Sequence, residues 1–202
     1  MSKKQPRNTK GKIISAAWKL FYEQGYDDTT IDDTTIDEII AESATSKGSF
    51  YHYFEGKDAL LGSLSFLFDE KYMELEAQLS GFATRYEQLI YLNQELFSMI
   101  ENSISLDLLA RLLSTQLITK GEKHLLDRNR YYYKLLRRII REGQDGGEFR
   151  TDLSVNEMVK LYAIAERALL YDWCICNGEY SLKTYGSTAM PIYLSQIRIR
   201  DI

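Results

Sequence analysis

The chain has 202 residues, of which 45% are hydrophobic, so it can bury a full core in one large domain or in a small domain joined to a larger one. Its formal net charge of −4 argues against a nonspecific nucleic-acid binder, and any DNA contact must come from local basic groups. No apolar run approaches the roughly 18 residues that cross a bilayer, and residues 1–12 are basic and polar, so we expect a cytoplasmic protein without a membrane anchor.

The first predicted helix runs from about Thr9 to Gln24. Ile13, Ala17 and Phe21 recur there at helical spacing, and Gly25 suits the end of a helix. The string DDTTI then occupies residues 27–31 and is repeated without a gap at residues 32–36. One of the two copies is therefore surplus to a compact helical domain.

The second predicted helix begins at the second copy of the repeat. Thr35 and Glu38 have the spacing of a capping box, and the helix should end near Ser43. An alternative starts this helix at Thr30, although Asp-Asp-Thr-Thr is poor helix interior. If Thr35 is the cap, the first copy forms a surface loop, and we expect its two extra carboxylates to oppose the binding of a nearby phosphate.

A third helix follows after a short turn. Ser46 can cap it, and Phe50 can point back into the core while Lys47 faces outward. A helix that enters the major groove by its N-terminal end needs short polar side chains there, so that the backbone can approach the phosphates. Residues 45–49 meet this requirement, and Gly48 removes a side chain where close approach matters. The pattern predicts a helix-turn-helix.

The remainder of the chain keeps a helical pattern and shows no convincing strand. We expect helices at about 56–79, 84–102, 105–119, 122–143, 155–177 and 182–200, with Pro191 kinking or interrupting the last one. The predicted fold is therefore all-α, with about nine helices.

The run TSKGSFYHYFEGKDALL at residues 45–61 resembles the recognition helix and the start of the fourth helix of TetR/AcrR-type transcriptional regulators. The resemblance covers about residues 9–65 by motif. It implies a three-helix DNA-binding domain at residues 1–56 and a larger effector-binding and dimerisation domain at residues 57–202. It also implies a homodimer formed through helices 155–177 and 182–200. A small-molecule effector would then change the separation of the recognition helices and release a palindromic, double-stranded operator.

The same resemblance implies which residues contact DNA. Lys47 and Ser49 are the better candidates for base edges, and the others should contact mostly phosphates. One departure concerns Ala44, because the family usually has glycine in this turn, and a positive φ there would cost alanine about 1 kcal/mol. The full predicted set is Thr35, Thr45, Ser46, Lys47, Gly48, Ser49, Tyr51, His52 and Lys57.

Aromatic residues are abundant in the second part of the chain. An aromatic cavity would suit a flat or apolar effector, although aromatic side chains at helical spacing also form ordinary core or dimer interface. A basic stripe that includes Arg128 and Arg137 could attract an anionic effector or simply be a solvated face. The candidate effector residues are Tyr91, Phe97, Tyr132, Tyr162 and Trp173.

Other classes of function find little support. His52 and His124 are the only histidines, and no Gly-rich phosphate loop, nucleophile elbow or metal-ligand spacing occurs, so we expect no enzyme, no metal and no cofactor. The remaining rival is a helical ligand-binding dimer whose DNA binding is weakened or lost, because the repeat and Ala44 both fall in the predicted DNA-binding domain.

Overall fold

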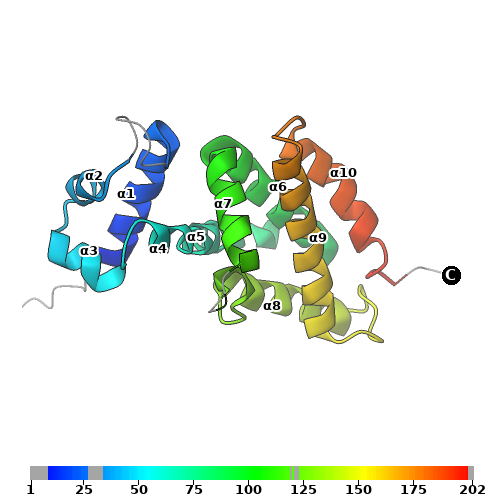
Figure 1. Cartoon of the computed structure of the whole chain (residues 1–202). Helices are drawn as coiled ribbons and strands as arrows, with labels where there is room; N and C mark the ends of the chain where they lie inside the picture. The colour runs from blue at the N-terminus through cyan, green and yellow to red at the C-terminus, as the bar shows by residue number, and fades with distance from the viewer. Residues whose placement is uncertain (1–8, 27–33, 119, 121–122, 200–202) are drawn as a thin grey trace, which may run out of the picture.

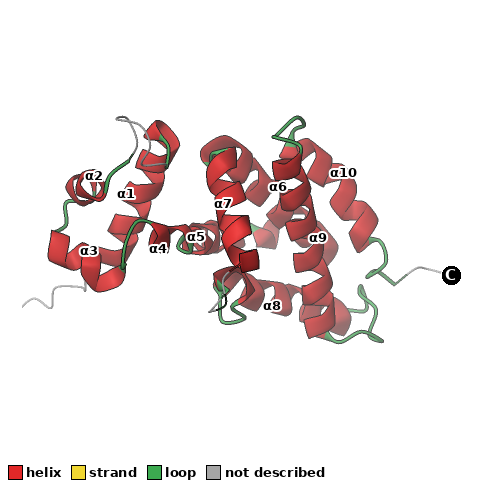
Figure 2. Ribbon diagram, viewed as in Figure 1, coloured by secondary structure: helices red, strands yellow, loops and turns green. Residues whose placement is uncertain are grey.

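The computed structural model describes residues 9–26, 34–118, 120 and 123–199, so the first copy of the repeat lies outside the described residues. Within these ranges the regular secondary structure consists of helices, as Figure 2 shows, and the prediction of an all-α fold is confirmed. A single isolated antiparallel bridge joins Phe149 to Arg198.

Three helices form a small N-terminal bundle: α1 (Thr9–Gln24), α2 (Ile36–Glu42) and α3 (Lys47–Tyr53). In Figure 1 this bundle lies apart from the larger group of helices, and α4 and α5 lead from one to the other. Its core consists of apolar side chains that are almost completely buried: Ile13, Ile14, Ala17, Phe21, Ile39 and Phe50.

The second helix begins where the capping box predicts. Thr35 has extended backbone angles, φ −99° and ψ 162°, and its hydroxyl accepts a hydrogen bond from the amide of Glu38 at 3.3 Å. The Glu38 carboxylate in turn accepts from the Thr35 amide at 2.7 Å. The alternative start at Thr30 is wrong, because Thr34 and Thr35 are not helical.

The helix expected at 56–79 is divided into α4 (Asp58–Leu61) and α5 (Leu64–Glu76). The break at Gly62 and Ser63 has two visible causes. The His124 ring occupies the space that a side chain at position 62 would fill, and the Ser63 hydroxyl donates a hydrogen bond to the Leu60 carbonyl. Neither contact could be anticipated from helical periodicity.

Five longer helices form the second, larger group: α6 (Arg85–Ser103), α7 (Leu106–Ile118), α8 (Tyr131–Asp145), α9 (Val155–Ile175) and α10 (Leu182–Leu194). α6 packs against α5, α8 and α10, and α9 packs against α7, α8 and α10. Figure 1 shows α9 and α10 side by side on the face farthest from the N-terminal bundle.

Two predicted helix boundaries are wrong. The helix expected at 122–143 begins only at Tyr131, after a short 3₁₀ turn at His124–Leu126. The last helix ends at Leu194 instead of 200, because the chain after it pairs with the loop before α9: Arg150 donates to the Ile197 carbonyl at 2.9 Å. Pro191 lies inside α10 and does not interrupt it.

No helix in the described ranges is long and apolar enough to span a membrane. The same ranges contain no group of three or more histidine, cysteine, aspartate or glutamate residues placed to hold a metal ion.

The turn between α2 and α3 contains the positive φ expected at Ala44, with a value of 50°. Glycine adopts this conformation without the clash that a Cβ creates, so Ala44→Gly should raise the free energy of unfolding by about 1 kcal/mol. Urea denaturation would measure the change. The matched substitution Ala41→Gly, inside α2, should lower stability by a similar amount; destabilisation by both would show that the turn at Ala44 is unstrained.

Candidate nucleic-acid interface and effector cavity

The N-terminal end of α3 is an exposed, polar surface. Ser46 caps the helix by accepting a hydrogen bond from the amide of Ser49 at 3.1 Å, and the two hydroxyls lie 2.9 Å apart. Thr45 is half-buried, and its hydroxyl bonds to that of Ser43 at 2.7 Å. These short groups allow the helix end to approach a phosphate backbone closely.

The side chains along α3 divide cleanly between core and solvent. Phe50 is fully buried and anchors the helix, whereas Tyr51 and His52 are exposed. Lys47 is also exposed, and its amino group bonds to the carboxylate of Asp37 at 3.3 Å. Because both members of this surface pair are well solvated, the pair contributes little to stability, and Lys47 can exchange Asp37 for DNA.

Gly48 lies on the same exposed surface. A Cβ at this position would meet only the Ser46 hydroxyl, at 3.9 Å. The fold therefore does not require glycine here, and the missing side chain is compatible with the close approach of another molecule.

Lys57 lies inward instead of toward the surface. Its ammonium donates hydrogen bonds to the carbonyls of Tyr26 and Thr34 and lies 4.7 Å from the centre of the Tyr26 ring. Tyr26 precedes the repeat and Thr34 belongs to its second copy, so Lys57 joins the chain on both sides of residues 27–33. A phosphate contact would require Lys57 to leave both carbonyls, so the contact expected at this position stays a prediction.

A cavity lies in the larger group of helices, between α5, α6, α7, α8 and α9. Its volume in this closed form is about 40 Å³, so a ligand much larger than water must widen it. The lining is mostly apolar, with five charged or hydroxyl-bearing exceptions on α5, on α9 and at the start of α8. The apolar residues are Phe68, Leu96, Leu109, Leu112, Leu113, Leu125 and Leu170, and the exceptions are Tyr72, Arg130, Tyr132, Glu166 and Arg167.

Of the five candidate effector residues, only Tyr132 lines this cavity. Phe97 packs against Gly186 of α10, and Trp173 donates a hydrogen bond to the Tyr180 carbonyl at 2.8 Å.

The other two candidates also serve packing between helices. Tyr162 donates to the Leu89 carbonyl at 2.9 Å, and Tyr91 donates to the Gln78 side chain at 2.6 Å. Helical spacing identified buried aromatics, but it could not distinguish the few that surround a cavity from those that join two helices.

Glu166 is the cavity residue that sequence reasoning missed. It lies on α9 with 4% of its surface exposed, and it accepts hydrogen bonds from the Tyr132 hydroxyl at 2.6 Å and the Asn93 amide at 3.0 Å. Burial raises the pKa of its carboxyl, although these hydrogen bonds act in the opposite direction. The one available sequence signal was a glutamate within the apolar stripe of α9, between Ala165 and Leu169.

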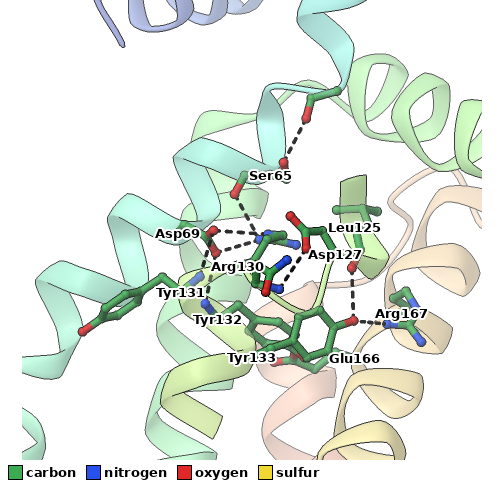
Figure 3. Close-up of polar contacts among 12 residues, drawn as sticks. Ser65, Asp69, Leu125, Asp127, Arg130, Tyr131, Tyr132, Tyr133, Glu166 and Arg167 are labelled. Carbon is green, nitrogen blue, oxygen red and sulfur yellow. Dashed lines mark hydrogen bonds and ion pairs between the residues drawn. The ribbon is translucent and has the colours of Figure 1, made fainter. Parts of the chain in front are cut away.

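The cavity wall is bonded directly to α5. The Asp69 carboxylate pairs with the Arg130 guanidinium at 2.9 Å and accepts hydrogen bonds from the amides of Tyr131 and Tyr132, both at 3.2 Å. Arg130 also donates to the Ser65 carbonyl at 3.0 Å. Figure 3 shows this cluster, which we call the Asp69 clasp, at the N-terminus of α8, where the helix dipole favours a carboxylate.

Two further contacts join the larger domain to the N-terminal bundle. The Trp18 indole of α1 donates a hydrogen bond to the Ser63 hydroxyl at 3.0 Å, at the break between α4 and α5. The guanidinium of Arg111, on α7, lies 5.6 Å from the centre of the Tyr26 ring. A displacement of α5 would therefore be transmitted to α1 and to the DNA-binding helices.

A basic cleft of about 320 Å³ lies on the outer side of the cavity, between α8 and α9. Arg128, Arg137, Lys160 and Arg167 line it, and none forms an ion pair with any residue in the described ranges. Arg167 lines both the cleft and the cavity, which brings a cationic surface next to an apolar interior. We use "basic cleft" for this site below.

Comparison with known proteins identifies the N-terminal part. Residues 13–64 match the family described as bacterial regulatory proteins, tetR family. The N-terminal domain belongs to the tetR family. A regulator encoded in the lacX 3′ region of Lactococcus lactis subsp. lactis is 49% identical over 51 residues, which are 25% of this chain and 24% of that protein. The chain thus matches about a quarter of that relative's length.

Similarity to TetR-family regulators extends over the whole chain at lower identity. The fatty acid metabolism regulator protein of Bacillus subtilis (strain 168) is 24% identical over 198 residues, covering 96% of this chain and 98% of that protein. FadR of Thermus thermophilus, solved in complex with lauroyl-CoA, superposes with a TM-score of 0.72 at 21% identity, covering 95% and 96% of the two chains. The Thermus thermophilus protein is a TetR-family transcriptional repressor, and the superposition shows that this chain has the same fold.

Gly48→Ala should separate folding from DNA binding. Alanine should raise the free energy of unfolding by about 0.5–1 kcal/mol, because it favours the helix and meets open space. Its methyl group should nevertheless hold α3 away from the phosphates and weaken binding to DNA from the upstream region of its own gene, measured by fluorescence anisotropy. Gly81→Ala, equally unobstructed but far from α3, serves as control; unchanged affinity for Gly48→Ala would remove Gly48 from the interface.

Titration of the Glu166 carboxyl should make the free energy of unfolding fall as pH rises. Since its folded-state pKa lies above the ordinary value of 4.5, the folded protein binds more protons than the unfolded chain above that pH. Glu166→Gln cannot titrate, so the stability of the wild type relative to this variant should decrease between about pH 4.5 and neutrality. Urea denaturation across that range tests this, with the exposed Glu74→Gln as control; parallel pH profiles for wild type and Glu166→Gln would contradict it.

Proposed function

We propose that the protein is an operator-binding repressor whose release is controlled by an amphiphilic, anionic effector of the fatty acyl-CoA class. The observation that carries this proposal is the Asp69 clasp. It bonds two residues of the cavity wall, Arg130 and Tyr132, to α5, the helix that leads to the DNA-binding bundle. An effector that widens the cavity must displace that wall, and α5 with it.

The contacts with DNA are proposed to come from the N-terminal end of α3. Lys47 and Ser49 face the base edges in this proposal, while Thr45, Ser46, Tyr51 and His52 contact phosphates and Gly48 permits close approach. Thr35 caps α2 with its hydroxyl, so its own contact with a phosphate would come through the exposed helix start.

The effector class is supported by two neighbouring sites of opposite character. Half of the residues that line the cavity are leucines, which suit a hydrocarbon chain, and the basic cleft beside it offers four cations that form no ion pair with the described residues, which suit phosphates. A fatty acyl-CoA carries both groups in one molecule. FadR of Thermus thermophilus, which has the same fold, was solved with lauroyl-CoA, and this supports the choice.

Lauroyl-CoA should release the protein from its upstream DNA at concentrations where CoA alone does not, because only the acyl chain can widen the cavity. Anisotropy of labelled DNA, titrated with either compound, measures the release. Arg137→Gln, in the basic cleft, should raise the concentration needed by about tenfold through loss of one charge-assisted contact. Arg150→Gln, distant from the cleft, provides the control; equal response of Arg137→Gln and wild type would exclude the cleft.

A homodimer through α9 and α10 is proposed from the apolar side chains that these helices leave exposed. They include Leu161 and Ile175 on α9 and Ile192 and Tyr193 on α10, of which Ile192 is 68% exposed and Ile175 is 76% exposed. Exposed apolar groups gathered on adjacent helices are typical of an interface between subunits. Two half-sites of a palindromic operator would then meet two recognition helices.

Ile192→Glu should convert the dimer to a monomer, because burying two carboxylates at a symmetric interface is strongly unfavourable. Sedimentation velocity would measure the mass of each variant. Leu117→Glu makes the same change at an equally exposed position on α7 and should leave the dimer intact. A dimeric Ile192→Glu variant would place the interface elsewhere.

A further inference from the structure

Tyrosine hydroxyls and a carboxyl form one polar corner of the cavity, apart from the two arginines that also line it. Tyr72 of α5, Tyr132 of α8 and Glu166 of α9 come together there from three different helices. The rings of Tyr72 and Tyr132 lie 5.0 Å apart, and the Tyr132 hydroxyl donates to Glu166. A cavity meant only for hydrocarbon would have no use for this corner, since buried polar groups that lack partners destabilise a fold.

Glu166 is held in place, but its hydrogen-bonding capacity is not exhausted. Its two oxygens accept hydrogen bonds from the Asn93 amide and the Tyr132 hydroxyl, and the Tyr162 hydroxyl also lies within reach of the carboxyl; a carboxylate has about four acceptor sites, so it can take a further donor. No cation in the described ranges is ion-paired with it. Its neighbour Arg167 turns toward the Tyr133 hydroxyl, at 3.5 Å, as Figure 3 shows. Glu166 is therefore positioned to accept a hydrogen bond from something inside the cavity.

Tyr72 supplies a hydrogen-bond donor in the same corner of the cavity. Its side chain is 1% exposed, and its hydroxyl, although close to the Glu166 carboxyl, makes no hydrogen bond of ordinary geometry with any of the described residues. A buried hydroxyl without a partner is uncommon in folded proteins and calls for a specific reason. Here the hydroxyl belongs to a residue that lines the cavity beside an under-used carboxyl, so a bound ligand would satisfy both groups at once.

We propose that the effector carries a hydroxyl group on the portion that enters the cavity, and that this group accepts a hydrogen bond from Tyr72 and donates one to Glu166. The inference rests on the proposed function in taking the cavity as the effector site. It narrows the effector class from a plain acyl chain to one with an alcohol or phenol substituent. A saturated hydrocarbon chain would cover both polar groups and leave them without partners.

Phenol and toluene test the polar corner without any acyl-CoA, because they have nearly the same shape and differ by a hydroxyl in place of a methyl group. Dissociation constants from saturation-transfer NMR with the wild-type protein should favour phenol by about tenfold. Equal affinity for the two compounds, or binding of neither, would overturn the proposal.

Two tyrosine variants separate recognition from packing. Tyr72→Phe should fold normally, because it removes only an unpaired hydroxyl, and it should lose the tenfold preference for phenol. Tyr86→Phe removes a hydroxyl that donates to the Pro191 carbonyl and does not line the cavity, so it should keep the preference. A preference retained in folded Tyr72→Phe would show that this hydroxyl does not recognise the ligand.

Acyl-CoA pairs then distinguish this inference from the proposed function. Release of upstream DNA should need about tenfold less of at least one hydroxydodecanoyl-CoA, substituted at position 3 or 12, than of lauroyl-CoA. If lauroyl-CoA releases DNA as effectively as both hydroxylated compounds, the hydroxyl inference fails while the acyl-CoA proposal stands. If no acyl-CoA releases DNA, the proposed effector class fails, and the phenol and toluene comparison still decides the role of the polar corner.

Discussion

The buried ion pair between Asp69 and Arg130 is the interaction on which the two halves of the molecule depend. Its side chains are 14% and 9% exposed, and Asp69 also receives two backbone amides from the start of α8. Removing one partner of such a pair leaves an uncompensated charge in the interior, which is far more costly than the pair itself is favourable. The pair therefore fixes where α5 lies relative to α8 whenever the cavity is closed.

This arrangement gives the cavity a mechanical connection to the recognition helix. Arg130 and Tyr132 line the cavity, and Arg130 pairs with Asp69 of α5. Ser63, at the start of α5, accepts a hydrogen bond from Trp18 of α1. The short break at Gly62 and Ser63 lets α5 move without carrying α4 rigidly with it. In the proposed mechanism, the two states that an effector selects between would differ in the packing of α5.

Lys57 shows that a position which a family pattern assigns to DNA can also hold the fold together. Its ammonium binds the carbonyl of Tyr26, before the repeat, and that of Thr34, in the second copy. The chain on either side of the surplus residues is thereby held together. The capping box at Thr35 sets the start of α2 independently of them, so the spacing from Thr35 to α3 is preserved.

Local sequence was sufficient for most of the helices and for their caps, because capping interactions and apolar periodicity act within a few residues: Thr35 with Glu38, and Ser46 with Ser49. The family resemblance added the expectation of a positive φ at Ala44, which the structure has. Only the tertiary structure decided which aromatic residues surround a cavity, that α4 and α5 are separate, and that Tyr72 and Glu166 meet, 94 positions apart. Such contacts depend on how whole helices pack, and periodicity along one helix carries no information about the side chains that face it from another.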